Sequence, residues 1–261
     1  MSNSLVSIHP SAQIGQNVII EPFSVIGEGV VIGDHCVIGP NASILKGARI
    51  GNYCKVFPGA VIAAEPQDLK YNGEDTTVTV GDFTTIRECV TINKGTALDR
   101  GNTGIGERCT IMAYTHVAHD CVIANDVILA NSVQMAGHVV IEEFAFIGGT
   151  TAIHQYVKIG SHTMISGGSL VRKDVPPFIT AAREPLTYLG INSVGLRRRG
   201  FTDAKINELQ EIYRLFYLSG MHNTEALDHI RTDLVPSPER DEIIQFIERS
   251  SRGLIRSIKE A

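Results

Sequence analysis

The stretch IHPSAQIGQNVIIEPFSVIGEGVVIGDHCVIGPNASILKGARIGNYCKVFPGAVI, residues 8–62, decides the fold of this 261-residue chain. An aliphatic residue recurs in it at every sixth position: Ile8, Ile14, Ile20, Ile26, Ile32, Ile38, Ile44, Ile50, Val56 and Ile62. Four places after each stands a small or short side chain, such as Ala12 or Cys36. The rhythm restarts at Val80 and again from Ile105 to Val171. A period of six fits neither a helix nor a long strand, but it fits short strands separated by turns.

Three such hexads make one triangular coil, and residues 18 apart then stack at about 4.8 Å, the spacing of paired strands. The aliphatic side chains fill the interior of the stack. A glycine often follows the aliphatic residue, as at Gly15 and Gly33, and we expect it to supply the permissive backbone that a corner needs. The sequence therefore predicts a mainly β fold, a parallel β-helix whose coils contact only their neighbours.

Two segments, residues 63–79 and 93–104, interrupt the rhythm and are predicted to be loops that leave the solenoid. After Val175 the pattern ends at Pro176 and Pro177. Beyond it, the spacing of apolar residues predicts helices over 202–219, capped by Thr202, over 224–232, and from Ser237 onward. We expect a β-helix domain over residues 1–190 with the two loop insertions, followed by a small helical domain over residues 191–261.

The composition favours a globular protein of the cytoplasm. Hydrophobic residues make up 43% of the chain, and the mean hydropathy is +0.07. The sequence shows no apolar stretch of the roughly 18 residues that a membrane span needs, and no recognisable secretory signal. Five cysteines are too few for a disulfide scaffold and fit a reducing compartment. A net charge of −5 argues against nucleic acid as the main partner. We therefore expect neither nucleic-acid binding nor stable membrane insertion.

The most specific local feature is YTHVAHDCVI, residues 114–123. Val117 and Cys121 occupy interior positions, so His119 and Asp120 are predicted to face outward at a corner. Counting 18 residues onward, Asp120 stacks beneath His138 and His119 stacks beneath Gly137. Two histidines and a carboxylate then meet on one edge of adjacent coils, with no side chain covering His119.

This combination suits acyl transfer to a hydroxyl group. An imidazole can remove a proton near neutral pH, and a neighbouring carboxylate fixes its tautomer. The exposed N–H of a glycine can stabilise an oxyanion. Two other interpretations remain open at this point: solvated corner histidines of a non-catalytic solenoid, and a zinc site made of His116, His119 and His138, as in the γ-class carbonic anhydrases that share this solenoid.

The cysteines and the basic clusters are two further groups that could carry chemistry. Four cysteines stand at interior positions and are interpreted as core residues: Cys36, Cys54, Cys109 and Cys121. Cys89 does not stand at such a position. The basic residues Arg172 and Lys173, and the run Arg197–Arg199, come at and just after the end of the coils. They suggest an anchor for phosphates or for an acidic protein.

An ordered set of motifs resembles the UDP-N-acetylglucosamine O-acyltransferases of lipid A biosynthesis. After DLKYNGE come YTHVAHDCVI, MAGHVV, GGTTAIHQYVKIG, DVPPFITA and GLRRRGF. The resemblance covers essentially the whole chain. It implies left-handed winding, although parallel crossovers are nearly always right-handed. It also implies a homotrimer that transfers a (3R)-3-hydroxyacyl group from acyl carrier protein to the 3-hydroxyl of UDP-N-acetylglucosamine, without metal or cofactor.

The resemblance also implies roles for individual residues. His119 matches the general base, Asp120 its supporting carboxylate and the Gly137 backbone the oxyanion donor. Positions that line the sugar and acyl sites are matched by Asp68, Lys70, His116, His138, His154 and Gln155. Asn192, Arg198 and Arg199 match nucleotide-binding positions, and Gly167 falls where the family sets acyl length, with room for a long chain.

The chain departs from the family at three places. Asn93 stands where familiar members have histidine, Val194 where they have a glutamate near the nucleotide, and REPLTY, residues 183–188, replaces a different segment beside the acyl groove. These changes do not affect the catalytic assignment. The details of nucleotide contact and of acyl-chain length, however, do not carry over from the family. The related N-acyltransferase of the same pathway is the nearest alternative, and GLRRRGF with the helical tail favours the O-acyltransferase.

Overall fold

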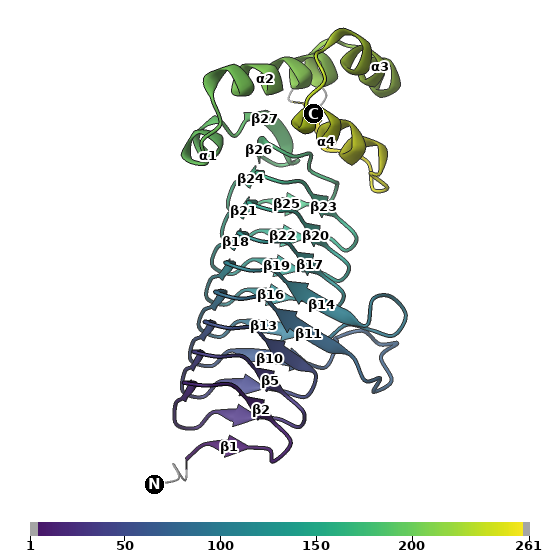
Figure 1. Ribbon diagram of the computed structural model, residues 1–261. Coiled ribbons are helices and arrows are strands. Elements are labelled where there is room, and N and C mark those ends of the chain that lie inside the picture. The colour runs from purple at the N-terminus through teal and green to yellow at the C-terminus, as the bar shows by residue number, and fades with distance from the viewer. Residues whose placement is uncertain (1–4, 258–261) are drawn as a thin grey trace.

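The computed structural model describes residues 5–257. They form a tall stack of triangular coils with a group of helices over its C-terminal end (Figure 1). Three sheets make the faces of this prism, and consecutive strands up to β25 belong to the three sheets in turn. Among the described residues, the helices are too short or too polar to cross a membrane.

Sheet A consists of β1 (Ser7–Ile8), β4 (Val25–Ile26), β7 (Ser43–Ile44), β10 (Val61–Ala64), β13 (Thr91–Asn93), β16 (His116–Val117), β19 (Gln134–Met135), β22 (Ala152–Ile153) and β25 (Leu170–Val171). Sheet B consists of β2 (Gln13–Ile14), β5 (Val31–Ile32), β8 (Ala48–Ile50), β11 (Thr77–Val80), β14 (Asn102–Ile105), β17 (Val122–Ile123), β20 (Val140–Ile141) and β23 (Lys158–Ile159). Sheet C consists of β3 (Ile19–Ile20), β6 (Val37–Ile38), β9 (Lys55–Val56), β12 (Thr85–Ile86), β15 (Thr110–Ile111), β18 (Ile128–Leu129), β21 (Phe146–Ile147), β24 (Met164–Ile165), β26 (Ile179–Ala182), β27 (Thr187–Ile191) and β28 (Arg256–Ser257).

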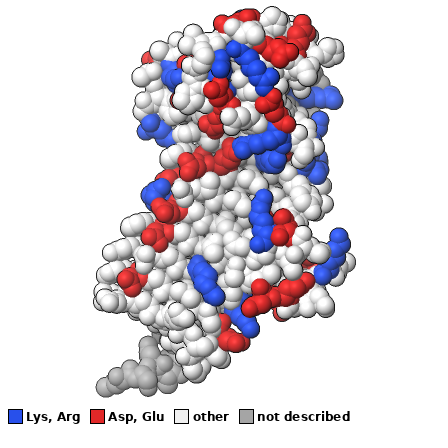
Figure 2. Space-filling model, turned by 45° about the vertical axis from the view of Figure 1, so that its right-hand side comes forward, with Lys and Arg blue, Asp and Glu red and all other residues white. Residues whose placement is uncertain are grey.

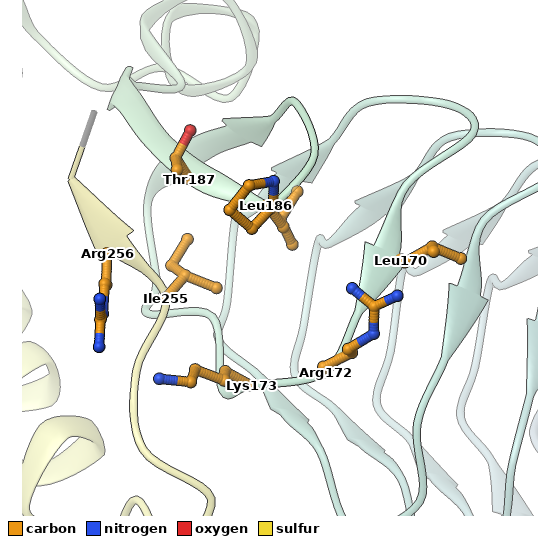
Figure 3. Close-up of a pocket in the computed structure, with 8 residues that line it drawn as sticks. Leu170, Arg172, Lys173, Leu186, Thr187, Ile255 and Arg256 are labelled. Atoms are coloured by element: carbon orange, nitrogen blue, oxygen red, sulfur yellow. The ribbon is translucent and has the colours of Figure 1, made fainter. Parts of the chain in front are cut away.

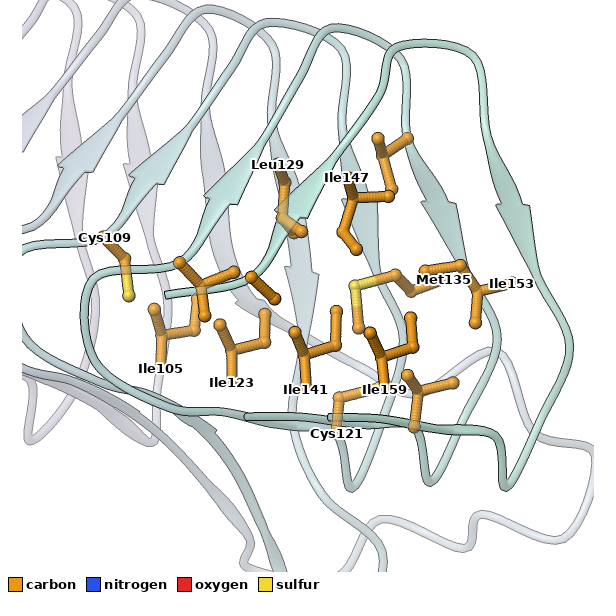
Figure 4. Packing of buried hydrophobic residues seen from close by; sticks show 14 of the residues in the cluster. Ile105, Cys109, Cys121, Ile123, Leu129, Met135, Ile141, Ile147, Ile153 and Ile159 are labelled. Atoms are coloured by element: carbon orange, nitrogen blue, oxygen red, sulfur yellow. The ribbon is translucent and has the colours of Figure 1, made fainter. Parts of the chain in front are cut away.

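All strand pairs between coils are parallel, and the predicted left-handed β-helix is confirmed. Ile123 pairs with Ile141 and Ile141 with Ile159, as the 18-residue spacing requires. Figure 4 shows these side chains as a ladder that points into the prism. All three are buried, and they belong to one hydrophobic cluster that runs from the lower coils into the helices.

The lowest coils depart from this pattern. Ile8 and Ile14 were expected inside the prism, but they are 46% and 37% exposed. Each is at or near the open end of the stack, where no coil lies below to cover an aliphatic side chain. From Ile26 upward the interior positions are buried.

The glycines after the aliphatic residues do not have the structural role expected for a corner. Gly33 does not adopt a left-handed φ; that conformation occurs two residues later, at His35, with φ of 57°. A Cβ on Gly33 would lie only 2.7 Å from the carbonyl carbon of Gly51 in the next coil. The expectation of a permissive corner backbone was therefore wrong, because these glycines are needed for the close approach of neighbouring coils.

The predicted helices are confirmed as α2 (Asp203–Leu218), α3 (Asn223–Asp233) and α4 (Pro238–Glu248). Thr202 caps α2 by accepting a hydrogen bond from the N–H of Lys205, and Ser237 caps α4 in the same way. The short helix α1 (Ser193–Arg198) was not predicted, since six residues give too little apolar periodicity to recognise.

The helices are fastened to the top of the prism. Tyr213 of α2 is fully buried and donates a hydrogen bond of 2.7 Å to the carbonyl oxygen of Pro177. The chain end returns as β28, which pairs with β27. The expected boundary between residues 190 and 191 falls inside β27, and the hydrophobic cluster is continuous across it. The two-domain division therefore stays a proposal.

Charged side chains of both signs are interspersed on the face shown in Figure 2, over the helices and along the coils. Acidic and basic residues alternate there, without one extended basic surface in that view. Any electrostatic attraction of a partner to this face must therefore come from local groups of charge.

Replacing Ile141 by Ala tests the interior ladder. The substitution removes buried methyl groups between two coils, and we expect the free energy of unfolding to fall by about 2–5 kcal/mol. The matched control is Ile8→Ala at the exposed end, where we expect a change below about 1 kcal/mol. Equal losses in the two variants, measured by denaturant unfolding, would contradict the assignment of the core.

Candidate active site

One edge of the prism, between sheets A and B, carries most of the predicted chemistry, and we call it the site corner. It is formed by the turns at residues 118–121, 136–139 and 154–157 in three successive coils. The predicted stacking is confirmed: the N–H of His138 donates to the carbonyl oxygen of His119 at 3.0 Å, and the rings of His138 and Tyr156 stack at 4.3 Å.

Asp120 faces outward from the prism, as predicted, but it is not exposed. The loop between β13 and β14 covers it completely. Both carboxylate oxygens accept a hydrogen bond of 3.0 Å from the N–H of Thr96, and one of them accepts a second, of 2.7 Å, from the Thr96 hydroxyl. Burial works to raise the pKa of Asp120, but the hydrogen bonds from His119 and Thr96 outweigh it and hold this pKa below its usual value.

His119 lies against this carboxylate, with its Nδ1 at 2.9 Å from Oδ2 of Asp120. An ionised carboxylate only accepts hydrogen bonds, so Nδ1 carries the proton and Nε2 presents a lone pair. Gly137 lies over the ring: a Cβ there would be 2.6 Å from the His119 ring atoms Cε1 and Nε2. The predicted absence of a covering side chain is thus confirmed, and within residues 5–257 the Gly137 N–H has no hydrogen-bond partner.

Both interruptions of the rhythm leave the prism at the site corner, on the right in Figure 1. The loops, residues 65–76 and 94–101, are shorter than the interrupted segments because β10, β11, β13 and β14 extend into them. They contact each other: the Asn93 side chain donates to the carbonyl oxygen of Glu65 at 2.7 Å, and Lys94 lies over the ring of Tyr71. Asn93, the departure from the family histidine, therefore joins the two loops.

A cavity of about 470 Å³ lies between these loops and the site corner. It brings together three predicted residues, Asp68, Lys70 and His138. It is also lined by Thr96, Leu98, Asp99, Arg100, Val140, Tyr156, Lys158 and Ser251. Thr96, Asp99 and Arg100 were missed. The only available signal was the interrupted rhythm around them, which marks a loop but not its path.

Three further predicted residues lie around the same corner. His116 is on the outer face of β16, where its Nδ1 is 2.7 Å from the hydroxyl of Thr91 and burial lowers its pKa. His154 and Gln155 are exposed, one coil beyond Gly137.

The remaining predicted residues are at other corners. Asn192 caps α1 and donates at 2.9 Å to the carbonyl oxygen of His162, at the corner between sheets B and C. Arg199 binds the carbonyl oxygen of Phe144 at the same corner, and Arg198 is exposed beside it. Gly167 is exposed at the corner between sheets C and A. A single chain does not bring these residues to His119.

The potential metal ligands at the site corner form a different set from the one considered for zinc. Atoms of His119, Asp120 and His138 lie within 4.8 Å of one another, and His116 does not belong to this group. The carboxylate of Asp120 is already engaged by Thr96 and His119. The three-nitrogen arrangement is therefore not formed.

A second cavity, of about 300 Å³, lies where the last coil meets the returning chain end (Figure 3). Its apolar wall contains Leu170, Pro185, Leu186 and Ile255, together with Thr187. Arg172, Lys173 and Arg256 are also among its lining residues. The predicted pair Arg172 and Lys173 thus borders an apolar groove beside the REPLTY segment, with Arg172 paired to Glu184 at 2.7 Å.

Comparisons with known proteins agree with this geometry. Residues 174–255 match the family model described as UDP N-acetylglucosamine O-acyltransferase, domain 2, and residues 11–46, 29–64 and 102–137 match the bacterial transferase hexapeptide model. An acyl-[acyl-carrier-protein]–UDP-N-acetylglucosamine O-acyltransferase of Aliivibrio fischeri is 44% identical over 262 residues, which cover 98% of this chain and 100% of that protein.

Solved structures give the same result. A UDP-N-acetylglucosamine acyltransferase from Bacteroides fragilis 9343 superposes with a TM-score of 0.96 and 48% identity, covering 98% of this chain and all of the other. The enzyme of Francisella novicida superposes with a TM-score of 0.95 and 37% identity, covering 98% and 94%. These relatives favour O-acyl transfer over the N-acyltransferase, the zinc enzyme and the non-catalytic solenoid. The chain belongs to the family of acyl-[acyl-carrier-protein]–UDP-N-acetylglucosamine O-acyltransferases.

Proposed function

We propose that this enzyme transfers a (3R)-3-hydroxyacyl group from acyl carrier protein to the 3-hydroxyl of UDP-N-acetylglucosamine, the first step of lipid A biosynthesis, in the cytoplasm. The names of its relatives support the two substrates. The observation that carries the chemistry is the His119–Asp120 pair, held by Thr96 and left uncovered by Gly137.

In the proposed mechanism, Nε2 of His119 takes the proton of the sugar hydroxyl as its oxygen attacks the thioester carbonyl carbon. The buried carboxylate of Asp120 stabilises the imidazolium that results. The N–H of Gly137 donates to the oxyanion of the tetrahedral intermediate. When the carbon–sulfur bond breaks, His119 returns its proton to the departing pantetheine thiolate, so that no external acid, metal or cofactor is required.

The cavity beside the site corner has the chemistry for the acceptor sugar and its diphosphate. Lys70, Arg100 and Lys158 line it together with Asp68 and His138. Cationic side chains suit phosphate oxygens, and Asp68 and His138 suit hydroxyl groups. We assign His116, His154 and Gln155, around the same corner, to the sugar and acyl sites.

We also propose that the enzyme works as a homotrimer, and the placement of the other predicted substrate-binding residues supports this proposal. Asn192, Arg198 and Arg199 lie at one corner and Gly167 at another, whereas His119 is at the third. A neighbouring copy turned by a third of a revolution can present one of these corners to the site corner of the first. We assign nucleotide binding to Asn192, Arg198 and Arg199 of a neighbour, and acyl-chain length to the space beside Gly167.

Replacing His119 by Ala should lower turnover by roughly 10² to 10⁴ while the protein remains folded. The loss follows because no other described side chain with an accessible lone pair is held by the buried carboxylate. The matched control is His229→Ala, an exposed histidine of α3 that also contacts a carboxylate, and it should behave as wild type. A folded His119→Ala enzyme with near-native turnover would refute the general-base role.

Co-expression of two variants with different defects tests the shared site. His119→Ala lacks the base, and Arg198→Ala, which changes an exposed side chain, should raise KM for the nucleotide sugar about tenfold. If the two residues serve one site from different copies, mixed trimers regain sites with both residues, and activity at low substrate should exceed that of either variant alone. Activity no higher than the parental variants in purified mixed oligomers would place both residues in a single-chain site.

Lys173→Ala tests capture of the acidic carrier protein. Removing a charge at the edge of the second cavity should raise KM for the acyl carrier protein about threefold at low salt, and much less at high salt, because screening already weakens the attraction there. KM for the nucleotide sugar should stay constant. Lys55→Ala, an exposed lysine in the lower coils, serves as the control. A salt-independent KM in the wild type would exclude this role.

A further inference from the structure

A second histidine–carboxylate pair lies next to the first at the site corner. Nδ1 of His138 is 2.6 Å from Oδ2 of Asp99, which belongs to the loop between β13 and β14. The His138 side chain is 12% exposed and the Asp99 side chain 37%. A carboxylate accepts only, so Nδ1 of His138 carries a hydrogen and its Nε2 is left free, as in His119.

The neighbouring rings hold the plane of His138 but do not select its orientation. Its ring is nearly parallel to that of Tyr156, with an interplanar angle of 6°, and it meets the His119 ring edge-on at 4.9 Å. A half-turn about the Cβ–Cγ bond keeps the stacking on Tyr156 but puts the ring carbons Cδ2 and Cε1 where Nδ1 and Nε2 had been. Among the described residues, Asp99 alone is hydrogen bonded to the His138 ring, so it is the group that selects the orientation.

The two pairs differ in how firmly the carboxylate is held. Asp120 is buried and accepts hydrogen bonds from Thr96 as well as from His119. Asp99 is partly exposed, and His138 is the partner that its side chain contacts. The same loop therefore supplies Thr96 to support the first carboxylate and Asp99 as the second carboxylate. The two histidine rings are adjacent, with ligand atoms of His119 and His138 within 4.8 Å of each other.

We propose that Asp99 is a positioning residue that fixes the tautomer and orientation of His138, so that Nε2 of His138 accepts a hydrogen bond from the acceptor sugar and aligns its hydroxyl with His119. This inference rests on the proposed function for the reaction itself. Misalignment of the attacking hydroxyl lowers kcat and changes KM little, because the substrate still binds but is seldom in the reactive geometry.

Three substitutions at Asp99 separate charge and hydrogen bonding from loop structure. Asp99→Ala should lower kcat about tenfold and change KM for the carrier-linked donor less than twofold. Asp99→Asn should lower kcat at least as much, because its amide can donate to Nδ1 and so favour the wrong tautomer. Asp99→Glu, which keeps a carboxylate on an exposed loop, should return kcat to within about threefold of wild type. Asp233→Ala is the control, since Asp233 contacts His229 in the same way at 2.7 Å, far along the chain on α3.

The decisive experiment combines a double-mutant cycle with 15N NMR of histidine-labelled protein. If Asp99 acts through His138, kcat of the Asp99→Ala/His138→Ala double variant equals that of His138→Ala alone. At alkaline pH the His138 signals, identified by their loss in His138→Ala, should show the proton on Nδ1 in the wild type and a mixture of tautomers in Asp99→Ala.

Independent, multiplying effects on kcat, or a wild-type His138 with its proton on Nε2, would overturn the proposal. The NMR measurement judges the tautomer even if the wild-type enzyme forms no acyl product. In contrast, product formation that is abolished in His119→Ala but normal in Asp99→Ala would leave the proposed function standing and refute the role of Asp99.

Discussion

The close stacking of coil on coil is the constraint on which the rest of this structure depends. Parallel pairing sets the rise at about 4.8 Å, and the aliphatic ladder fills the interior at that spacing. The outer backbone is also tight: a Cβ on Gly51 would lie 2.9 Å from the backbone nitrogen of Asp82 in the next coil. An insertion within a face would separate the coils above and below it. Extra residues are therefore accommodated at a corner, where a loop can leave the prism, and both loops of this chain do so.

The site forms where the regular prism and an irregular loop meet. The prism supplies the column of His119, Gly137 and His138, whose relative positions follow from strand pairing alone. Asp120 and His138 both have left-handed φ values, 58° and 64°, at the corner. Aspartate and histidine tolerate this conformation better than most residues, so the turn of the solenoid favours such side chains at a corner. The loop then covers Asp120 and removes it from water, which makes the hydrogen bonds to its carboxylate effective.

The division between prism and loop also explains how much the sequence could predict. Stacking of His138 over the corner of Asp120, and the gap left by Gly137, follow from counting 18 residues, and so does burial of Cys109 and Cys121. The burial of Asp120 and the contacts of Asp99 could not be derived in this way. The paired residues Ile92 and Val117 are more than 18 residues apart, so the count fails across the loop. The exposure of Ile8 was missed for a related reason, because a repeat does not reveal where the stack ends.

A convex corner cannot enclose a substrate by itself, and this geometry gives the strongest reason to expect a partner at the site. One wall of the cavity comes from the loops and another from the coils, but His154 and Gln155 remain exposed beside it. Arg198, which is exposed, lies at a different corner of the same chain. A rigid prism cannot fold these edges toward each other, since its coils are fixed by the packed interior. Joining them would require a second copy, so the rigidity of each prism edge supports the proposal of a site shared between copies.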